Sequence, residues 1–224
     1  DGASEMVFFS TDMVYGKPQY LPVDAGHPQQ PFGYYGASKK KAEDICRKFR
    51  DRGMNITIFR PRMIIGKGRL GILIKLFKLI EWNLPVPMIG SGKNCYQMVS
   101  VNDCADAVLK AVDHNFPNAE YNLGSKNPPQ VKELLQGIIK QNRSKSVLLP
   151  TWGSFVKAVL GIFGKVGVEI MYKEQYMIAD EDYIIDISQT EKELGWHPQY
   201  NDADMMQAAF IEYQNHQRKE DKND

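Results

Sequence analysis

The order of apolar and helical segments in the first 60 residues is the feature that most constrains the fold. Met6-Val-Phe-Phe-Ser10 is a short apolar run typical of a buried strand, and residues 33–52 have a helical pattern that ends just before Gly53. Asn55-Ile-Thr-Ile-Phe59 is a second strand, rich in β-branched residues. Strand, helix and strand in this order predict two parallel strands joined by a right-handed crossover. The expected fold class is therefore α/β.

The rest of the chain continues this alternation. We expect further strands at 96–101, 119–123 and 146–149, and further helices at 70–82, 102–112, 130–141, 189–195 and 203–215. Residues 1–66 and 95–129 are expected to form part of a parallel sheet, and residues 67–94 and 130–216 a smaller α+β lobe. Residues 217–224 are almost entirely charged and are expected to form a frayed tail.

Composition argues against several classes of protein. The 28 Lys and Arg residues are matched by 27 Asp and Glu, whereas a protein that binds nucleic acid through phosphates usually has a clustered basic excess. Residues 155–171 are apolar but are interrupted by three charges, which argues against a membrane span. We therefore expect no nucleic-acid partner and no membrane span.

The cysteines and histidines indicate neither disulfides nor a metal. The three cysteines are odd in number and lack CxxC spacing, so a disulfide framework and a zinc site are both disfavoured. The four histidines are scattered without metal-ligand spacing. A reducing cytoplasm is the expected location, with no metal site.

Tyr35-Gly-Ala-Ser-Lys39 is the motif that most directly suggests chemistry. Positions i and i+4 share one helix face, so the Tyr35 hydroxyl and the Lys39 ammonium can point into one site. A phenol ordinarily has a pKa near 10, but a close ammonium favours the phenolate, which can take a proton from an alcohol. Ser10 and Thr11 follow the first strand, at the sheet edge where α/β proteins place their sites. A hydroxyl there can bind a substrate oxygen beside the tyrosine.

Together these segments resemble the extended short-chain dehydrogenases/reductases, and in particular the NAD-dependent epimerase/dehydratase family. The resemblance extends over nearly the whole chain and rests on six elements that occur in the family's order. They are Val7 to Gly16 (Val-Phe-Phe-Ser-Thr-Asp-Met-Val-Tyr-Gly), Pro31 with Tyr35-Gly-Ala-Ser-Lys39, Phe59-Arg-Pro61 with Ile65-Gly66, Val99-Ser-Val-Asn-Asp-Cys-Ala105, Tyr121-Asn-Leu-Gly124, and Asp186 to Trp196. It implies a Rossmann-type domain in residues 1–66 and 95–129 that binds NAD or NADP, and a substrate-binding lobe in the remainder.

The resemblance also implies roles for individual residues. Tyr35 would be the catalytic acid/base, Lys39 would bind the nicotinamide ribose, and Thr11 would orient the substrate oxygen. Ser10, Pro61 and Met63 would join Tyr35 and Lys39 in cofactor binding. The implied contacts with the substrate come from Thr11, Asp12, Met13, Arg62 and Arg69.

Departures from the family pattern limit what the resemblance implies. Sugar-nucleotide 4,6-dehydratases have an Asp-Glu pair where this chain has Asp12-Met13, so dehydration is not expected. Met63 stands where many nucleotide-sugar enzymes have Asn, and the Arg expected near Cys95 or Tyr96 is absent. No GxGxxG or GxxGxxG turn for the cofactor pyrophosphate occurs. The family's glycine-rich portion, roughly one hundred residues, is therefore expected to be missing from this chain.

Three functions remain open from the sequence. The first is an NAD(P)-dependent epimerase or related oxidoreductase acting on a nucleotide sugar. The second is a reductase or dehydrogenase of a hydroxysteroid-like or other apolar alcohol, favoured by Met13, Met63 and the apolar segment 155–171. The third is a non-catalytic fragment that cannot hold cofactor. Family members often form homodimers, so the resemblance leaves a homodimer open as well.

Overall fold

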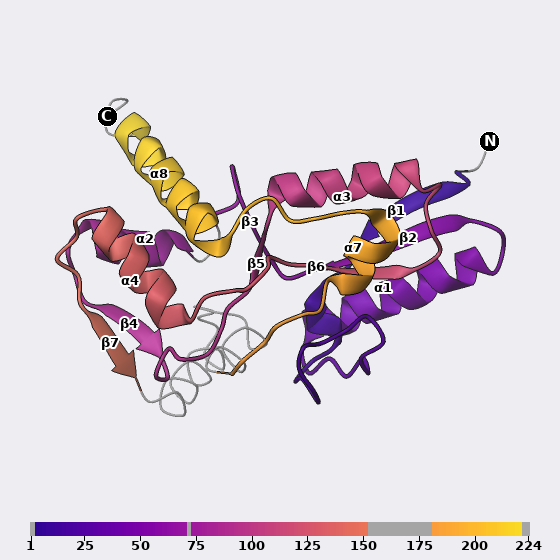
Figure 1. Ribbon diagram of the computed structural model, residues 1–224, viewed down its shortest axis with the longest axis horizontal. Coiled ribbons are helices and arrows are strands. Elements are labelled where there is room, and N and C mark those ends of the chain that lie inside the picture. The colour runs from indigo at the N-terminus through magenta and orange to yellow at the C-terminus, as the bar shows by residue number, and fades with distance from the viewer. Residues whose placement is uncertain (1–2, 71–72, 152–180, 221–224) are drawn as a thin grey trace. The chain divides into compact units, whose positions relative to one another are not determined.

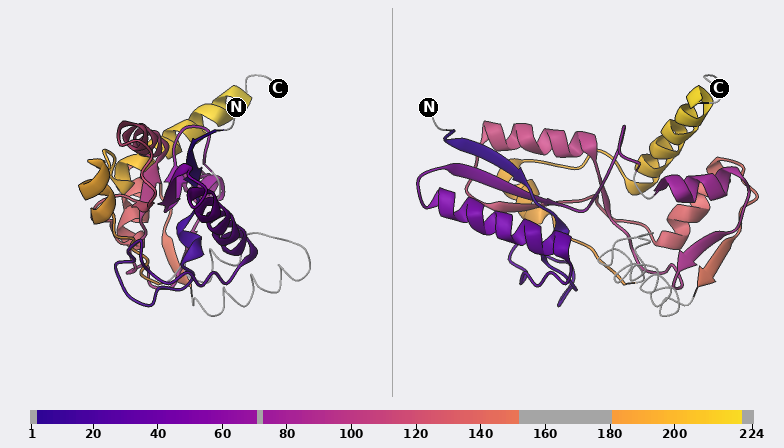
Figure 2. Two further views of the ribbon diagram at one scale, coloured as in Figure 1. Left: turned by 90° about the vertical axis from the view of Figure 1, so that its right-hand side faces the viewer. Right: turned by 180° about the vertical axis from the view of Figure 1, so that it is seen from behind.

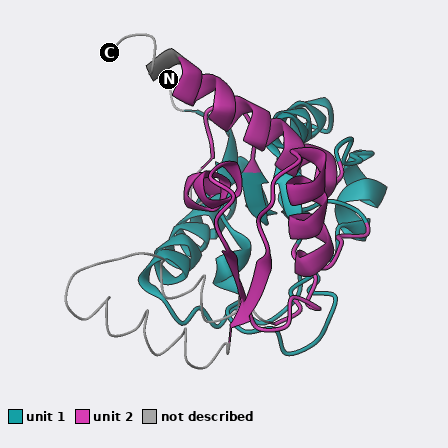
Figure 3. Ribbon diagram, turned by 90° about the vertical axis from the view of Figure 1, so that its left-hand side faces the viewer, with its two compact units in different colours: residues 1–64, 97–126, 183–200 teal, residues 65–96, 127–182, 201–224 magenta. Residues whose placement is uncertain are grey.

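The computed structural model describes residues 3–70, 73–151 and 181–220 (Figure 1). The chain divides into two compact units, which Figure 3 shows in different colours. Unit 1 comprises Asp1–Ile64, Gln97–Lys126 and Tyr183–Tyr200, and unit 2 comprises Ile65–Tyr96, Asn127–Asp182 and Asn201–Asp224. The expected lobe differs from unit 2 mainly because Tyr183–Tyr200 belongs to unit 1. The apolar segment 155–171 lies outside the described residues.

A three-stranded parallel sheet forms the centre of unit 1. Its strands, in spatial order, are β1 (Glu5–Phe9), β2 (Asn55–Pro61) and β6 (Glu120–Leu123). The register pairs Val7 with Thr57 and Phe59 with Tyr121. The crossover between β1 and β2 is α1 (Tyr34–Arg50), which runs along the strands in Figure 2. The parallel α/β arrangement expected from the first 60 residues is confirmed.

Helices cover both faces of this sheet because alternate strand residues point to opposite sides. On the α1 face, Ile56 and Ile58 are buried with Cys46. On the other face, Phe59 packs against residues of α3 (Val101–Asp113) and α7 (Ser188–Leu194). Trp196 is fully buried there and donates through its indole N–H to the carbonyl of Asp103 at 2.9 Å. This contact holds the segment after α7 against α3.

Short elements complete unit 1. A single turn of 3-10 helix, η1 (Asp12–Val14), follows β1. A two-stranded sheet pairs β3 (Met63–Ile65), whose last residue is assigned to unit 2, with β5 (Met98–Ser100). The sequence pattern does not predict β3, because three residues are too few to show a period. β1 lies at one edge of the described three-stranded sheet, and its apolar side chains are only half-buried, whereas those of β2 are mostly buried.

The described part of unit 2 contains a second small sheet and three helices. Its parallel strands are β4 (Val86–Ile89) and β7 (Leu148–Thr151), and its helices are α2 (Leu73–Glu81), α4 (Val131–Gln141) and α8 (Asp202–Glu220). The aromatic rings of Phe77, Phe210 and Tyr213 pack together between α2 and α8. α8 extends five residues beyond the expected end at residue 215, because the charged residues that follow favour helix as readily as coil. No helix in the described part of the chain is long and apolar enough to cross a membrane.

Candidate active site

The first part of the candidate site is the turn at the carboxyl end of β1. The backbone N–H of Ser10 donates to the carbonyl of Phe59 at 2.7 Å, which extends the pairing with β2 to the strand end. Thr11 is buried and caps η1: its hydroxyl accepts from the Met13 N–H at 3.3 Å and donates to the Asp12 carboxylate at 3.2 Å. The hydroxyl residues therefore lie at the edge of the sheet where the sequence predicted them.

The first two turns of α1 supply the second part of the site. Tyr35 is 50% exposed, so its ring has access to solvent. Lys39 is half-buried, and its ammonium donates to the carbonyl of Phe9 at 2.9 Å and lies 5.0 Å from the centre of the Phe8 ring. The Lys39 ammonium is therefore fixed at the end of β1, where it contacts the residue that precedes Ser10.

Gly36 brings these two parts into contact. A Cβ atom at this position would lie 2.5 Å from the carbonyl oxygen of Met13, which is closer than any side chain tolerates. The first turn of α1 thus packs backbone to backbone against η1. The glycine of the Tyr-Gly-Ala-Ser-Lys motif is required by this approach, which sets Tyr35 beside the turn that carries Thr11.

Asp12 and Arg62 have a different environment from the one expected for substrate-binding residues. Both side chains are buried, and the Arg62 guanidinium forms an ion pair with the Asp12 carboxylate at 2.5 Å. The ring of Tyr183 lies 4.2 Å from the guanidinium, and its hydroxyl donates to the Asp12 carbonyl at 2.9 Å. The structure therefore pairs the two residues with each other beneath the turn.

The remaining predicted residues are not all brought together. Pro61 is buried at the end of β2, opposite Leu123 of β6. Met13 and Met63 are half-buried, in η1 and at the start of β3. Arg69 belongs to unit 2, where it is exposed in a turn and its N–H donates to the Gly66 carbonyl at 2.9 Å.

A buried polar network, which the sequence pattern did not reveal, underlies the site. The Arg60 guanidinium makes two hydrogen bonds to the Glu43 carboxylate, at 2.9 and 2.7 Å, and a third to the Tyr15 hydroxyl at 3.0 Å. Tyr15 in turn donates to the Asn122 side chain at 2.7 Å. Glu43 follows Lys39 by four residues, so the helical spacing that singled out Tyr35 and Lys39 could have identified it.

The pKa values in this network follow from burial and charge. Burial alone would raise the pKa of Glu43, but the hydrogen bonds and charge of Arg60 outweigh it and hold that pKa below its ordinary value. Burial raises the pKa of Tyr15 to about 12, although Arg60 opposes the shift. Glu43 and Arg60 are therefore a charged pair at neutral pH, and Tyr15 is a neutral donor.

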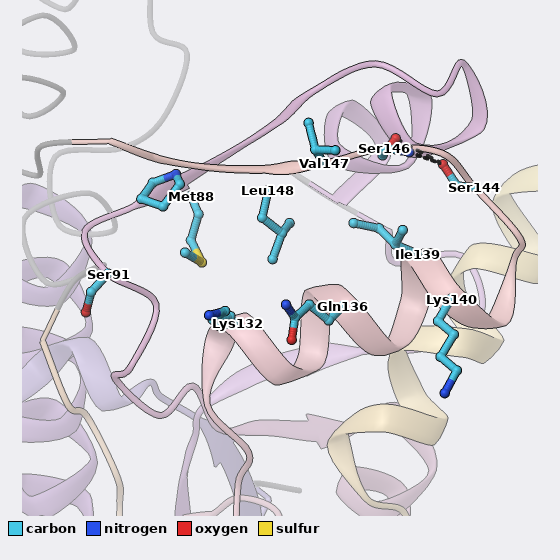
Figure 4. Close-up of a pocket in the computed structure, with 11 residues that line it drawn as sticks. Met88, Ser91, Lys132, Gln136, Ile139, Lys140, Ser144, Ser146, Val147 and Leu148 are labelled. Carbon is cyan, nitrogen blue, oxygen red and sulfur yellow. Dashed lines mark hydrogen bonds between the residues drawn. The ribbon is translucent and has the colours of Figure 1, made fainter.

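Unit 2 has a cavity of its own, shown in Figure 4, with a volume of about 610 Å³. It lies between α4 and the β4–β7 sheet, and Met88, Lys132 and Leu148 are among the residues that line it. None of the residues predicted for the active site contributes to it. Within residues 3–70, 73–151 and 181–220, no cluster of three or more His, Cys, Asp or Glu side chains could hold a metal ion.

Comparison with known proteins decides the family. The sequence profile of the NAD-dependent epimerase/dehydratase family matches residues 1–124, which is more than half of the 224 residues. The chain belongs to this family. The expectation drawn from its motifs is therefore confirmed.

Two sequence relatives are matched over part of their own length. It is 32% identical over 217 residues to the uncharacterized protein y4nG of Sinorhizobium fredii, covering 95% of this chain and 54% of the relative. It is 35% identical over 144 residues to a putative UDP-glucose 4-epimerase of Methanocaldococcus jannaschii, covering 61% of this chain and 46% of the relative. The chain thus spans about half the length of these curated relatives.

Solved structures confirm the family's Rossmann-type fold. UDP-glucuronic acid 4-epimerase from Bacillus cereus, in complex with NAD, matches with a TM-score of 0.72 at 17% identity, covering 94% of this chain and 61% of that one. RMD from Pseudomonas aeruginosa, complexed with NADPH, matches with a TM-score of 0.71 at 16% identity, covering 93% and 66%. Both proteins were solved with a nicotinamide cofactor.

Proposed function

We propose that this chain carries the catalytic part of an NAD(P)-dependent epimerase or related oxidoreductase that acts on a nucleotide sugar. The observation that supports it most is the packing of α1 on η1 through Gly36, because it sets Tyr35 and Lys39 beside the Thr11 turn. Relatives named as UDP-glucose and UDP-arabinose 4-epimerases support the substrate class.

The residues at the end of β1 fit the nicotinamide end of the cofactor. A half-exposed phenol and an ammonium one turn apart on α1 are donors suited to ribose hydroxyls. Ser10 follows β1, Pro61 is the last residue of β2, and Met63 is the first residue of β3. The sequence has no glycine-rich turn for the pyrophosphate. We therefore assign these residues to the nicotinamide ribose and none of them to the pyrophosphate.

The chain's own residues would move the proton of the reaction. When bound, the nicotinamide supplies the acceptor and donor of hydride. Tyr35 takes the proton of the substrate hydroxyl as the alcohol carbon is oxidised, and returns it when the ketone is reduced. The positive charge of Lys39 stabilises the phenolate that Tyr35 becomes. Thr11 would orient the substrate oxygen towards Tyr35.

A substitution at Tyr35 tests this assignment in the full-length protein. Tyr35→Phe removes the hydroxyl without changing the ring, and turnover should fall by about 10² to 10⁴. Tyr34→Phe is the matched control, because Tyr34 is the preceding residue of the same helix and is 97% exposed. Activity of the Tyr35 variant at the level of the Tyr34 variant would contradict the proposal.

An apolar alcohol is the second candidate substrate, because Met13 and Met63 lie half-buried beside the strand ends. Calorimetry with uridine and thymidine diphosphates distinguishes a nucleotide-sugar substrate from an apolar alcohol. Binding of either diphosphate supports a nucleotide sugar, whereas turnover of an apolar alcohol without such binding supports the alternative. A full-length protein that binds no NAD(P) would support the hypothesis of a non-catalytic protein that cannot hold cofactor.

A further inference from the structure

We propose that Glu43 is a positioning residue for Tyr35 and Lys39, and that it acts through its buried ion pair with Arg60. The inference rests on the proposed function, since it assigns Glu43 a part in that reaction. Glu43 itself is fully buried, so it is not offered as a group that touches substrate or cofactor.

The contacts of Glu43 leave its carboxylate fully bonded. Both oxygens accept from Arg60, which is only 2% exposed, at 2.9 and 2.7 Å. One of these oxygens also accepts from the side chains of Gln29 at 2.6 Å and Arg47 at 2.9 Å. A planar guanidinium that meets a carboxylate with two parallel bonds fixes the orientation of both side chains as well as their distance.

Arg60 joins α1 to the segments that form the site. It lies in β2, one residue before Pro61, and donates to the Tyr15 hydroxyl at 3.0 Å and to the Ala25 carbonyl at 2.8 Å. Tyr15 follows η1 directly. The Glu43–Arg60 pair therefore fixes the helix, the central strand and the end of the Thr11 turn relative to one another.

This arrangement determines where the reactive groups of α1 lie. Glu43 comes one helical turn after Lys39 and two after Tyr35. Rotation or sliding of α1 on the sheet would displace both groups, and a misplacement of about 1 Å can reduce turnover by about 10²-fold. Replacing a buried ion pair by apolar residues often leaves stability unchanged. Orientation is therefore the contribution that we assign to this pair.

The experiment measures turnover and its pH dependence in the full-length, folded protein. Glu43→Gln and the double variant Glu43→Met/Arg60→Met are compared with Glu120→Gln. Glu120 also pairs with α1, accepting from Arg50 at 2.8 Å, but in the last turn of the helix. The double variant removes both buried charges together and so avoids the unpaired Arg60 charge that Glu43→Gln leaves.

Both Glu43 variants should lower kcat by about 10- to 100-fold, and Glu120→Gln should leave it within about twofold. The rise of turnover with pH that accompanies deprotonation of Tyr35 should also move to higher pH in the Glu43 variants, because a displaced Lys39 would stabilise the Tyr35 phenolate less well. Unchanged kcat and pH profile in the folded double variant, or an equal effect of Glu120→Gln, would overturn the inference. Activity in Tyr35→Phe would instead overturn the proposed function, so the two failures are distinguishable.

Discussion

Asp12 and Arg62 form a buried ion pair between the turn that follows β1 and the residue that follows β2. Their carboxylate and guanidinium lie 2.5 Å apart, and Tyr183 contacts both residues, through its ring on Arg62 and its hydroxyl on the Asp12 carbonyl. Burial, together with the Asp12 charge, raises the pKa of Tyr183, so this hydroxyl stays protonated and continues to donate. Three segments far apart in the sequence are thus joined at the strand ends.

Removing one partner of this pair should be costly. Arg62→Met leaves the Asp12 carboxylate buried without its counter-ion, and we expect the free energy of unfolding to fall by about 3–5 kcal/mol. The double variant Asp12→Asn/Arg62→Met should recover much of that loss, since it removes both charges. Urea denaturation of the three proteins measures the difference. Equal stability of the single and double variants would show that the pair is not electrostatically coupled.

The close approach at Gly36 gives a second prediction. Gly36→Ala places a methyl group against the Met13 carbonyl, so α1 or η1 must shift, and the cost should be about 1–3 kcal/mol. Gly137→Ala is the control, because Gly137 also lies in a helix but has no atom within 4 Å of the added carbon. That control should gain up to about 1 kcal/mol from helix propensity. Thermal unfolding of both variants tests this difference. Unfolding temperatures that change in the same direction in both variants would contradict the prediction.

The ion pair between Glu43 and Arg60 predicts that the free energy of unfolding depends on pH in the acid range. The pKa of Glu43 in the folded protein is below the ordinary 4.5, so the unfolded chain binds a proton more readily. The stabilisation that ionised Glu43 contributes is therefore complete above its ordinary pKa of 4.5, and it is lost as the pH falls through the lower pKa of Glu43 in the folded protein. Unfolding free energies measured by urea below about pH 5 should decline less steeply in Glu43→Gln. Glu5→Gln, which changes an exposed carboxylate in β1, should keep the wild-type slope, and a common slope would contradict the assignment.

The main elements of unit 1 could be predicted because their signals are local. β1 is a short apolar run, α1 has helical spacing and β2 is rich in β-branched residues, and a parallel sheet follows from their order. β4 has no such signal, since it is four residues long and contains Pro87. The segment Tyr183–Tyr200 was expected in the lobe but belongs to unit 1, because Ile187 and Trp196 are buried against the sheet strands and α3. Contacts between residues so far apart in the chain leave no local pattern.

For the candidate site, the sequence predicted positions better than contacts. Thr11 and Lys39 lie at the strand end, where the order of elements required them to be. The partner of Arg62 could not be predicted, because pairing with Asp12 depends on the side-by-side arrangement of β1 and β2. The same holds for Arg60 and Glu43, whose charges the sequence shows without showing that both are buried.

Asn122, from the Tyr-Asn-Leu-Gly segment of β6, supports the last prediction. Its side-chain amide donates to the carbonyls of Val23 and Asp186, at 3.0 and 3.1 Å, while its oxygen accepts from Tyr15. Asn122→Asp has nearly the same shape but replaces both donors by a buried acceptor that faces two carbonyl oxygens. Unsatisfied and charged groups in this position should lower the free energy of unfolding by about 3–5 kcal/mol.

The same substitution at Asn118 provides the control for this prediction. Asn118 is exposed, and its side-chain oxygen accepts from the Ile56 N–H at 2.7 Å, a bond that an aspartate keeps. Asn118→Asp should therefore change stability by less than about 0.5 kcal/mol. Urea denaturation at neutral pH compares the two variants. A loss at Asn122 no larger than that at Asn118 would mean that the amide donors of Asn122 do not hold the segments around Val23 and Asp186 against β6.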